Sequence, residues 1–351
     1  MRRKIGFIGY FAVGKSKAGG QEAKTCAVVR ALGKHYSRRD LRRLDTGNWK
    51  QTPWLFFNKV LYLVRTCPVL VIFPAQKSVR ILVPLLVLTG KPLLRKLHYV
   101  VIGGWLPEMT KHHKWLAYFL KKFNGIYVET NSMKDALEKQ GFTNVFIMPN
   151  FKNLRILTEN ELVYTTQEPF AFGTFSRVMK EKGIEDAINA ITQLNTQAGR
   201  TVATLDIYGK IDDNYAERFK DLQQTFPPYI HYTGIVAPNK SVDVLKNYFA
   251  LLFPTHYATE GIPGTLIDAY AAGIPVISGL WVNHKDIFIE NKTGLGFPLN
   301  NQTVLLDCIR HAVEKTDLFN AMKPLCLQEA QKYTPQVAIR VLLVRLTEKQ
   351  I

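Results

Sequence analysis

The segment from 260 to 277 reads EGIPGTLIDAYAAGIPVI and carries two acids, Glu260 and Asp268, around an expected helix start. Pro263 and Gly264 are typical of the first residues of a helix. Such a helix points its free backbone N–H groups and the positive end of its dipole toward the tips of the strands, where a diphosphate would sit. Glu260 precedes the helix and Asp268 falls in about its first turn. The two acids therefore either complement the helix dipole or contact a ligand.

A second segment, FGTFSRVMKEKGIEDAINAI from 172 to 191, places cations in a loop between an expected strand and an amphipathic helix. Arg177 and Lys182 flank this loop. Two cations at a strand end could hold a diphosphate and neutralise its charge as it becomes a leaving group. An isolated surface Arg or Lys is usually solvated, and Lys180 in the same loop fits that interpretation.

A third segment, GYFAVGKSKAGGQEAKT from 9 to 25, matches the P-loop pattern from Gly9 to Ser16, which would indicate a kinase or ATPase. A P-loop begins its helix at the Lys-Ser pair, whereas here Gly19 and Gly20 argue against a helix at that point. The first half also lacks a convincing apolar strand that ends in Asp. The P-loop NTPase stays the alternative function from this segment.

Together these segments resemble the retaining glycosyltransferases of the GT-B fold, family GT4, which carry two acids eight positions apart beside such a helix. The resemblance implies that Glu260 contacts hydroxyls of the donor sugar and that Asp268, where the family usually has Glu, binds the ribose. It implies that Arg177 and Lys182 hold the diphosphate of a nucleotide sugar. Transfer would proceed with retention of configuration, and bacterial capsule, exopolysaccharide and O-antigen enzymes are the most similar members.

The same resemblance implies further donor contacts from small residues in four loops. These are Gly19 and Gly20 after the first strand, Gly209 and Gly234 near the base, and Gly264 and Thr265 at the helix start. The sequence departs from many family members after a central strand of the first half, where Gly103, Gly104 and Trp105 stand in place of a donor-contacting His. This departure, together with Asp268, leaves open a catalytically inactive scaffold that binds a sugar nucleotide.

Short apolar runs alternate with helical patterns in both halves, which predicts two doubly wound parallel sheets, an α/β fold with two Rossmann-like domains facing across a cleft. The expected strands are 5–8, 69–73, 99–102, 125–128 and 145–148, then 170–173, 204–208, 231–233, 250–253 and 275–277. We expect a basic acceptor domain over 1–160, a nucleotide-sugar donor domain over 161–334, and a helix over 335–351 that packs across both.

The positive charge is concentrated in the first half. Residues 1–168 hold 28 Lys and Arg against 10 Asp and Glu, whereas residues 169–351 hold 18 of each. A one-sided basic surface suits an anionic membrane or a phosphate-bearing acceptor, such as a glycan linked to polyprenyl diphosphate, or merely keeps the protein soluble. Two clusters stand out, Arg38, Arg39, Arg42 and Arg43, and Lys111, Lys114, Lys121 and Lys122 with Trp115 and Tyr118 nearby. No single-stranded nucleic-acid signature accompanies them.

Cofactor and location follow from what the motifs lack. The sequence has no Asp-x-Asp in a likely donor site and no His/Cys cluster with metal-ligand spacing, so we expect no metal and no cofactor besides the nucleotide-sugar substrate. The four cysteines show no CxxC pair, which favours reduced thiols. With no signal peptide or uncharged 18-residue span, we expect a cytoplasmic protein at the inner face of the membrane.

Overall fold

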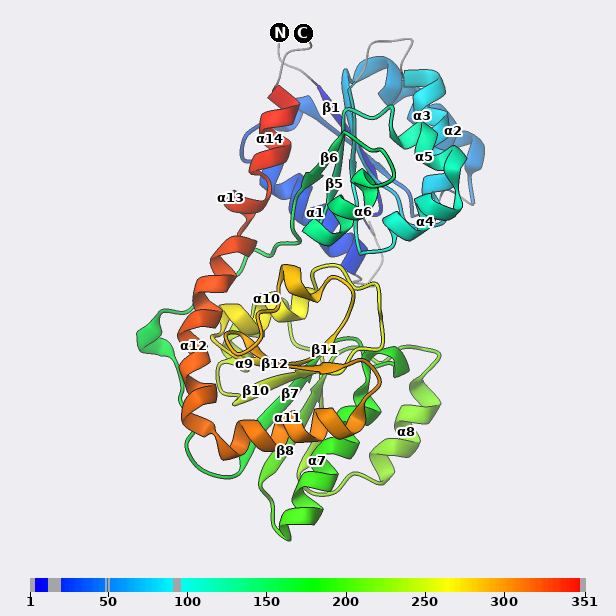
Figure 1. The fold of residues 1–351 in the computed structure, drawn as a ribbon. Helices are drawn as coiled ribbons and strands as arrows, with labels where there is room; N and C mark the ends of the chain where they lie inside the picture. The colour runs from blue at the N-terminus through cyan, green and yellow to red at the C-terminus, as the bar shows by residue number, and fades with distance from the viewer. Residues whose placement is uncertain (1–3, 12–19, 48, 50, 91–95, 348–351) are drawn as a thin grey trace. The chain divides into compact units, whose positions relative to one another are not determined.

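The computed structural model describes residues 4–11, 20–47, 49, 51–90 and 96–347 of the 351-residue chain. They form two compact units, one of residues 4–153 with 333–347 and one of residues 154–332. Each unit has a six-stranded parallel sheet covered by helices (Figure 1). Among the described helices, none combines the length and the apolar character needed to cross a bilayer.

The first unit has the strand order β2-β1-β3-β4-β5-β6. Its strands are β1 (Ile5–Gly9), β2 (Leu41–Asp45), β3 (Val69–Phe73), β4 (Lys96–Val100), β5 (Gly125–Val128) and β6 (Val145–Ile147). Its helices are α1 (Gly20–Leu32), α2 (Pro53–Thr66), α3 (Val79–Gly90), α4 (Leu106–His112), α5 (Lys114–Leu120), α6 (Asn131–Glu138), α13 (Pro335–Ala338) and α14 (Arg340–Thr347).

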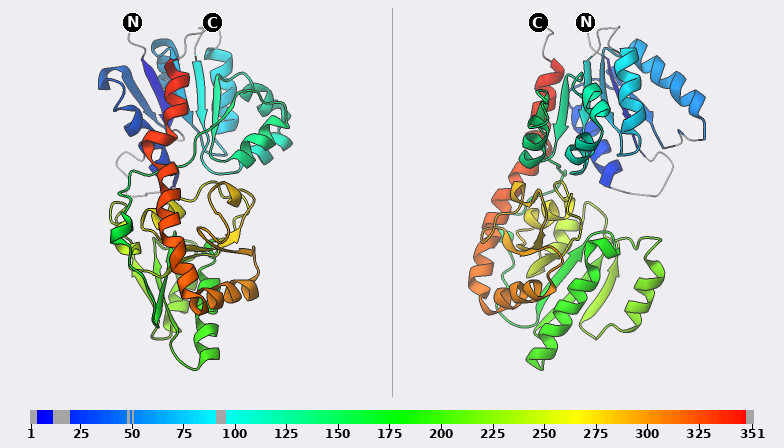
Figure 2. Two further views of the ribbon diagram at one scale, coloured as in Figure 1. Left: turned by 60° about the vertical axis from the view of Figure 1, so that its left-hand side comes forward. Right: turned by 45° about the vertical axis from the view of Figure 1, so that its right-hand side comes forward.

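Helices cover both faces of this sheet, as the alternation along β3 shows. Leu70 and Ile72 point into a core shared with α2 to α6, whereas Val71 and Phe73 point into a second core shared with α1, α13 and α14. Figures 1 and 2 show α14 on one side of the sheet and α2, α3 and α5 on the other. A strand buried on both faces needs a continuous apolar run, which explains why VLVIF was readable as a strand.

The second unit has the strand order β12-β11-β10-β7-β8-β9. Its strands are β7 (Phe170–Phe175), β8 (Ala203–Tyr208), β9 (Ile230–Gly234), β10 (Ala250–Phe253), β11 (Val276–Leu280) and β12 (Gly294–Pro298). Its helices are α7 (Ile184–Ala198), α8 (Ala216–Gln224), α9 (Ser241–Leu245), α10 (Gly264–Ala271), α11 (Gln302–Glu314) and α12 (Thr316–Ala330). Helix α7 packs against α11, and α10 packs against α9 and α12.

The strand order reverses between β7 and β10 in the second unit. The chain runs outward from β7 through β8 to β9, then returns to place β10 on the other side of β7. Loops that leave the carboxyl ends of two such strands diverge to opposite faces of the sheet, and ligands of doubly wound proteins bind in the resulting crevice. The same reversal occurs between β1 and β3 in the first unit.

Ten strands lie where the apolar runs predict them, some extended or displaced by a few residues. Two strands were missed, and both lie at a sheet edge. β2 reads LRRLD and has one buried residue, Leu44, so its two arginines obscure the pattern. β12 reads GLGFP, in which two glycines and a proline weaken the strand signal.

The C-terminal segment forms two short helices, α13 and α14, in place of the single helix expected over 335–351. Ala338, Ile339, Leu342 and Leu346 pack on the first unit's sheet with residues of α1. This contact places the segment after Tyr333 in the first unit, although the chain enters it from α12 of the second. Residues 348–351 lie outside the described part of the chain.

A buried ion pair links α1 to the carboxyl ends of β4 and β5. The ammonium group of Lys24 donates to a carboxylate oxygen of Glu129 and to the carbonyl of Val101, 3.3 Å away. Both charged side chains are almost fully buried, at 2% and 3% exposure. Burial lowers the pKa of Lys24, and the charge of Glu129 opposes that shift. Removing one partner leaves the other charge in a low-dielectric core.

We therefore expect Lys24→Met to reduce the free energy of unfolding by about 3–5 kcal/mol. The double variant Lys24→Met with Glu129→Leu should lose less than the sum of the two single variants, because no lone charge remains. Lys134→Met, which breaks the exposed pair with Glu138, is the control and should cost under about 0.5 kcal/mol. Urea unfolding followed by circular dichroism measures all four, and equal losses for Lys24→Met and Lys134→Met would contradict the interpretation.

Candidate functional site

The candidate site lies at the carboxyl ends of β7 and β10, where the strand order of the second unit reverses. Strands β7 and β10 are hydrogen-bonded neighbours, so the loops that follow Phe175 and Phe253 leave the sheet side by side. The first loop carries Arg177 and Lys182, and the second carries Glu260 and leads into α10. The two segments singled out from the sequence therefore meet at one edge of the sheet.

Lys182 and Glu260 form an ion pair at the centre of this site. The Lys182 ammonium group donates to a carboxylate oxygen of Glu260, and both side chains are 17% exposed. The same ammonium lies over the rings of Phe253 and Tyr257, at 5.5 and 4.9 Å from their centres. The hydroxyl of Thr255 donates to Glu260 over 3.2 Å. These contacts hold one cation and one carboxylate in fixed positions while leaving both accessible to a ligand.

The charge of this pair also affects Tyr257. Partial burial is the main cause that raises the pKa of its hydroxyl, and the negative charges of Glu181 and Glu260 add to the effect. The hydroxyl therefore keeps its proton at neutral pH and can act as a hydrogen-bond donor toward an anion.

Gly183, a residue that the motifs did not identify, lets the Lys182 turn approach the neighbouring strand. It follows the 3-10 turn Lys180–Lys182 with φ of +67°, and a Cβ atom there would lie 1.9 Å from the carbonyl oxygen of Pro254. The amide of His256 also donates to the carbonyl of Glu181 over 2.8 Å. Gly183 therefore sets how closely Lys182 approaches Glu260. A Gly just before an expected helix indicates that a left-handed residue is possible there, so the sequence did carry a signal for this position.

Arg177 lies in the same loop but farther from the pair. Its guanidinium is 3.4 Å from a carboxylate oxygen of Asp212, and its side chain is 49% exposed. A contact of this length on an exposed side chain holds the guanidinium weakly, so Arg177 can reorient toward a ligand. Lys180 is exposed, as expected for a solvated neighbour.

Gly209 and Gly234 lie at the carboxyl ends of β8 and β9, next to the Arg177 loop. A Cβ atom at Gly209 would lie 1.7 Å from the carbonyl oxygen of Ser176, so only glycine permits this approach. The amide of Gly209 donates to the carbonyl of Gly234 over 2.8 Å, and the Tyr232 hydroxyl donates to the carbonyl of Gly209 over 2.9 Å. Gly234 has φ of +86° and open space around it. Gly209 therefore serves loop packing, and Gly234 borders an open surface.

Helix α10 starts at Gly264, as its sequence predicts. Pro263 occupies the N-cap position and provides no side-chain hydrogen bond to the first turn. The Thr265 hydroxyl instead donates to the carbonyl of Phe175, which ties the start of α10 to the end of β7. The positive end of the helix thus lies at the same edge as Lys182 and Arg177.

Asp268 lies one turn deeper than expected. Because α10 begins at Gly264, Asp268 belongs to its second turn, and the expectation that it falls in the first turn is wrong. Its side chain is 2% exposed, and one carboxylate oxygen accepts a hydrogen bond from the Ser241 hydroxyl over 2.9 Å. A carboxylate held by a hydroxyl in this way links α10 to the start of α9. Contact of Asp268 with a ribose stays a prediction.

The remaining candidate residues belong to the first unit. Gly20 is the first residue of α1. Gly19 and the residues of the P-loop pattern from 12 to 16, which include Lys15 and Ser16, lie outside the described residues. Gly103 has φ of +82°, and its amide is 3.4 Å from a carboxylate oxygen of Glu129. The buried Lys24–Glu129 pair thus supports the loop that carries Gly103 and Gly104.

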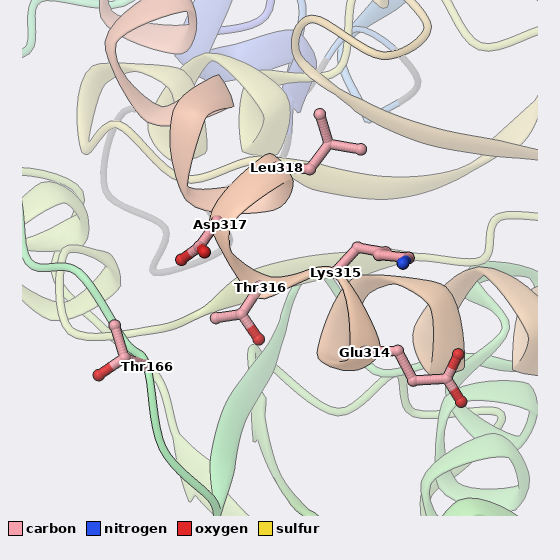
Figure 3. Close-up of a pocket in the computed structure, with 6 residues that line it drawn as sticks. All are labelled: Thr166, Glu314, Lys315, Thr316, Asp317 and Leu318. Carbon is pink, nitrogen blue, oxygen red and sulfur yellow. The ribbon is translucent and has the colours of Figure 1, made fainter.

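The described part of the chain offers neither a metal site nor a better-formed ligand site elsewhere. No group of three or more His, Cys, Asp or Glu side chains is close enough to hold a metal ion. A hollow lies at the junction of α11 and α12, lined by Thr166 and residues 314–318 (Figure 3). None of the candidate residues lines this hollow, and its open, solvated charges do not converge on one point. The strand tips of β7 and β10 remain the candidate site.

Comparison with known proteins agrees with this location. Residues 169–315, which lie within the second unit and include the whole Lys182–Glu260 site, match the family model described as "Glycosyl transferases group 1". No curated protein sequence matches the chain.

Three solved structures illustrate the fold. HepE from Anabaena, crystallised with UDP and glucose, superposes with a TM-score of 0.77 at 14% identity over 98% of this chain and 99% of its own. The sucrose-phosphate synthase of Thermosynechococcus elongatus gives 0.75 at 14% identity, with 98% of each chain covered. The lipopolysaccharide outer core galactosyltransferase WaaB, in its apo form, gives 0.69 at 15% identity, with 98% and 99% covered. The expected GT-B class, with two doubly wound α/β domains, is confirmed.

The close approach at Gly183 yields a test with an internal control. Gly183 and Gly199 flank the two ends of α7 with nearly equal φ of +67° and +65°, but nothing lies within 4 Å of a Cβ added at Gly199. Gly199→Ala should therefore cost only the left-handed strain, about 1–2 kcal/mol. Gly183→Ala adds the clash with Pro254 and should lower the free energy of unfolding further, as measured by urea denaturation. Equal costs would show that the loop can move away without penalty.

Proposed function

We propose that the chain is a nucleotide-sugar-dependent glycosyltransferase whose donor binds to the second unit. The observation that carries the proposal is the Lys182–Glu260 pair beside the start of α10, inside the segment that matches the group 1 model. A cation, a carboxylate and a helix N-terminus at one sheet edge provide separate partners for a diphosphate and for a sugar. The resemblance to family GT4 supports the finer assignment.

The donor diphosphate would be neutralised by protein groups alone. Lys182 is fixed by Glu260, Phe253 and Tyr257, so its charge is preorganised where the leaving group forms. Arg177 would add a second cation once it turns from Asp212. The start of α10, with Gly264 and Thr265, would supply backbone N–H donors.

Glu260 would orient the donor sugar. In the pair with Lys182 only one of its carboxylate oxygens is engaged by the cation and by Thr255, which leaves the other for sugar hydroxyls. The Glu260 backbone is also fixed, because the Asn283 side chain donates to its carbonyl over 2.6 Å. The acceptor hydroxyl would attack from the face that the leaving diphosphate occupies, which retains the configuration. Asp268 would bind the ribose, and Gly209 and Gly234 would flank the base.

A uridine nucleotide is the first donor to test. HepE was crystallised with UDP, with UDP and glucose, and with UDP-glucose, and its fold covers nearly the whole chain. Those complexes support a nucleotide-sugar donor for this chain as well. A donor at 100 times its dissociation constant would raise the free energy of unfolding by about 2.7 kcal/mol, which a thermal shift assay detects.

The acceptor would be a glycan carried by polyprenyl diphosphate at the cytoplasmic face of the membrane, as in capsule or exopolysaccharide synthesis. The excess of Lys and Arg over residues 1–168 supports a phosphate-bearing acceptor and an anionic membrane surface as partners of the first unit. An inactive scaffold that binds the donor without transfer is the other candidate, favoured by Asp268 and by the glycines at 103 and 104. Measurable sugar transfer would exclude the scaffold.

Substitutions in the site test the roles of its charges. Glu260→Ala and Arg177→Ala should each reduce sugar transfer by at least about a hundredfold, because Glu260 is a fixed contact for the sugar and Arg177 supplies a second positive charge to the leaving group in the transition state. Lys180→Ala, in the same loop but solvated, is the control and should keep near-normal transfer. Circular dichroism checks that the variants fold. Near-normal transfer by either site variant would contradict the assignment.

The response to chelation tests how the diphosphate is neutralised. We expect transfer to continue in excess EDTA, since Lys182, Arg177 and α10 supply the positive charge. Initial rates with and without EDTA, and after addition of magnesium, provide the measurement. Complete loss that magnesium restores would show that a metal ion carries the leaving-group charge.

A further inference from the structure

Acidic residues are nearly absent from a long stretch of the first unit that contains three of its helices. Residues 46–128 hold twelve Lys and Arg and a single acid, Glu108. This stretch includes α2, α3 and α5, which lie in one layer on the sheet face opposite α14 (Figures 1 and 2). Four of these cations, Lys59, Arg65, Arg80 and Lys114, lie on the three helices, so part of the excess positive charge of the first unit is on one helical layer.

Each of these three helices also exposes large apolar side chains on its outer side. The exposed fractions are 77% for Trp54, 50% for Leu55 and 57% for Tyr62 on α2, 48% for Ile81 and 67% for Leu88 on α3, and 45% for Trp115 and 59% for Tyr118 on α5. By contrast, α7, α8 and α11 of the second unit, all fully described, have no large apolar side chain of comparable exposure. We name the outer side of α2, α3 and α5 the basic aromatic face.

Basic residues are interleaved with these apolar side chains along the helices. Lys59 lies between Leu55 and Tyr62 on the exposed stripe of α2, and the Lys122 ammonium lies 4.8 Å from the ring centre of Tyr118. The helices are neighbours, since α3 packs against both α2 and α5. Arg80 of α3 is hydrogen-bonded to His113 before α5 over 2.9 Å. Because their inner sides pack on the same sheet face, their outer sides point the same way.

Helix α3 shows most clearly that this face needs a partner. Its sequence, VRILVPLLVLTG, has one charged residue and is apolar around its circumference. A helix of this kind is normally buried on all sides. Its inner side, with Leu82, Val83 and Leu86, is buried in the core, whereas Ile81 and Leu88 on the outer side are exposed.

We propose that the basic aromatic face docks on an anionic lipid bilayer, with α2, α3 and α5 lying in the interface. Trp and Tyr rings with flanking Lys and Arg suit a surface that is apolar inside and negatively charged outside. A nucleic acid offers phosphates but no medium for Leu55, Ile81 and Leu88. A second copy of the same face would bring two positive layers together. This inference rests on the proposed membrane-bound acceptor and assigns the side chains that contact the lipid.

The two basic clusters expected from the sequence differ in whether exposed apolar side chains accompany them. Arg39 and Arg43, at and beside edge strand β2, are exposed, but β2 and the turn before it present no exposed large apolar side chain. Lys114 lies on α5 beside the exposed Trp115. Of the lysine cluster, Lys114 and Lys122 lie beside Trp115 and Tyr118 of the basic aromatic face, whereas Lys111 lies on α4 and the Lys121 ammonium donates to the carbonyl of Gln140. The arginines near β2 serve as a matched control.

Vesicle binding of the full-length protein tests the proposal without any transfer reaction, so it can fail independently of the proposed activity. The wild type should sediment with phosphatidylglycerol-containing vesicles, less so at high salt, and far less with pure phosphatidylcholine. Lys59→Glu with Lys114→Glu should weaken binding at least about tenfold, since each Lys near an anionic surface contributes about fivefold. Arg39→Glu with Arg43→Glu changes the formal charge equally and should retain most of the binding.

A second pair of variants tests the apolar contribution. Leu88→Ser with Tyr118→Ser should weaken vesicle binding at least about tenfold, whereas Tyr164→Ser with Leu318→Ser, at similarly exposed positions of the second unit, should not. Equal losses in the face and control variants of either pair would show that binding does not depend on this face and would overturn the proposal. Self-association that the face variants abolish, without vesicle binding, would assign the face to a second copy and would also overturn it.

Discussion

The parallel pairing of β7 with β10 is the constraint on which the candidate site depends. It brings together loops whose ionic residues, Lys182 and Glu260, are 78 positions apart in the sequence. The chain passes through β8 and β9 between them, so the pair forms only when β10 returns to lie beside β7. Because its partners are so far apart in the sequence, this ion pair depends on the tertiary pairing of strands and cannot form within one local element.

Glycine positions decide how closely those loops approach. At Gly183 and Gly209 the space for a Cβ atom is already taken by the carbonyls of Pro254 and Ser176. Both contacts are between backbone groups, which cannot rotate away as a side chain can. The loops after β7, β8 and β10 are therefore fixed relative to one another before any ligand arrives. Preorganised loops need not be ordered on binding, which preserves binding energy for the contacts that stabilise a leaving group.

Short-range sequence patterns predict much of the fold but only part of the candidate site. Central strands such as β3 are buried on both faces, so their apolar runs are unambiguous, whereas β2 at the edge mixes arginines with a single buried Leu44. The ends of α10 were readable because Pro and Gly act locally. The pairing of Asp268 with Ser241 and the contact of Gly183 with Pro254 depend on residues 27 or more positions away, which local patterns do not encode.

The two units differ in the ratio of their basic to acidic residues and in how these residues are paired. In the second unit, residues 154–332, 20 acids stand against 16 cations, and the cations at the site have partners at contact distance, as Lys182 has Glu260 and Arg177 has Asp212. Residues 46–128 of the first unit hold twelve cations and one acid, so positive charge exceeds negative charge by eleven within that stretch. Positive charges in such excess repel one another, and their electric field acts on anions over a Debye length of about 8 Å at physiological salt. Paired charges in the second unit can select one ligand by geometry, whereas the diffuse charge of the first unit is suited to the extended anionic surface proposed above, which needs no single fixed contact.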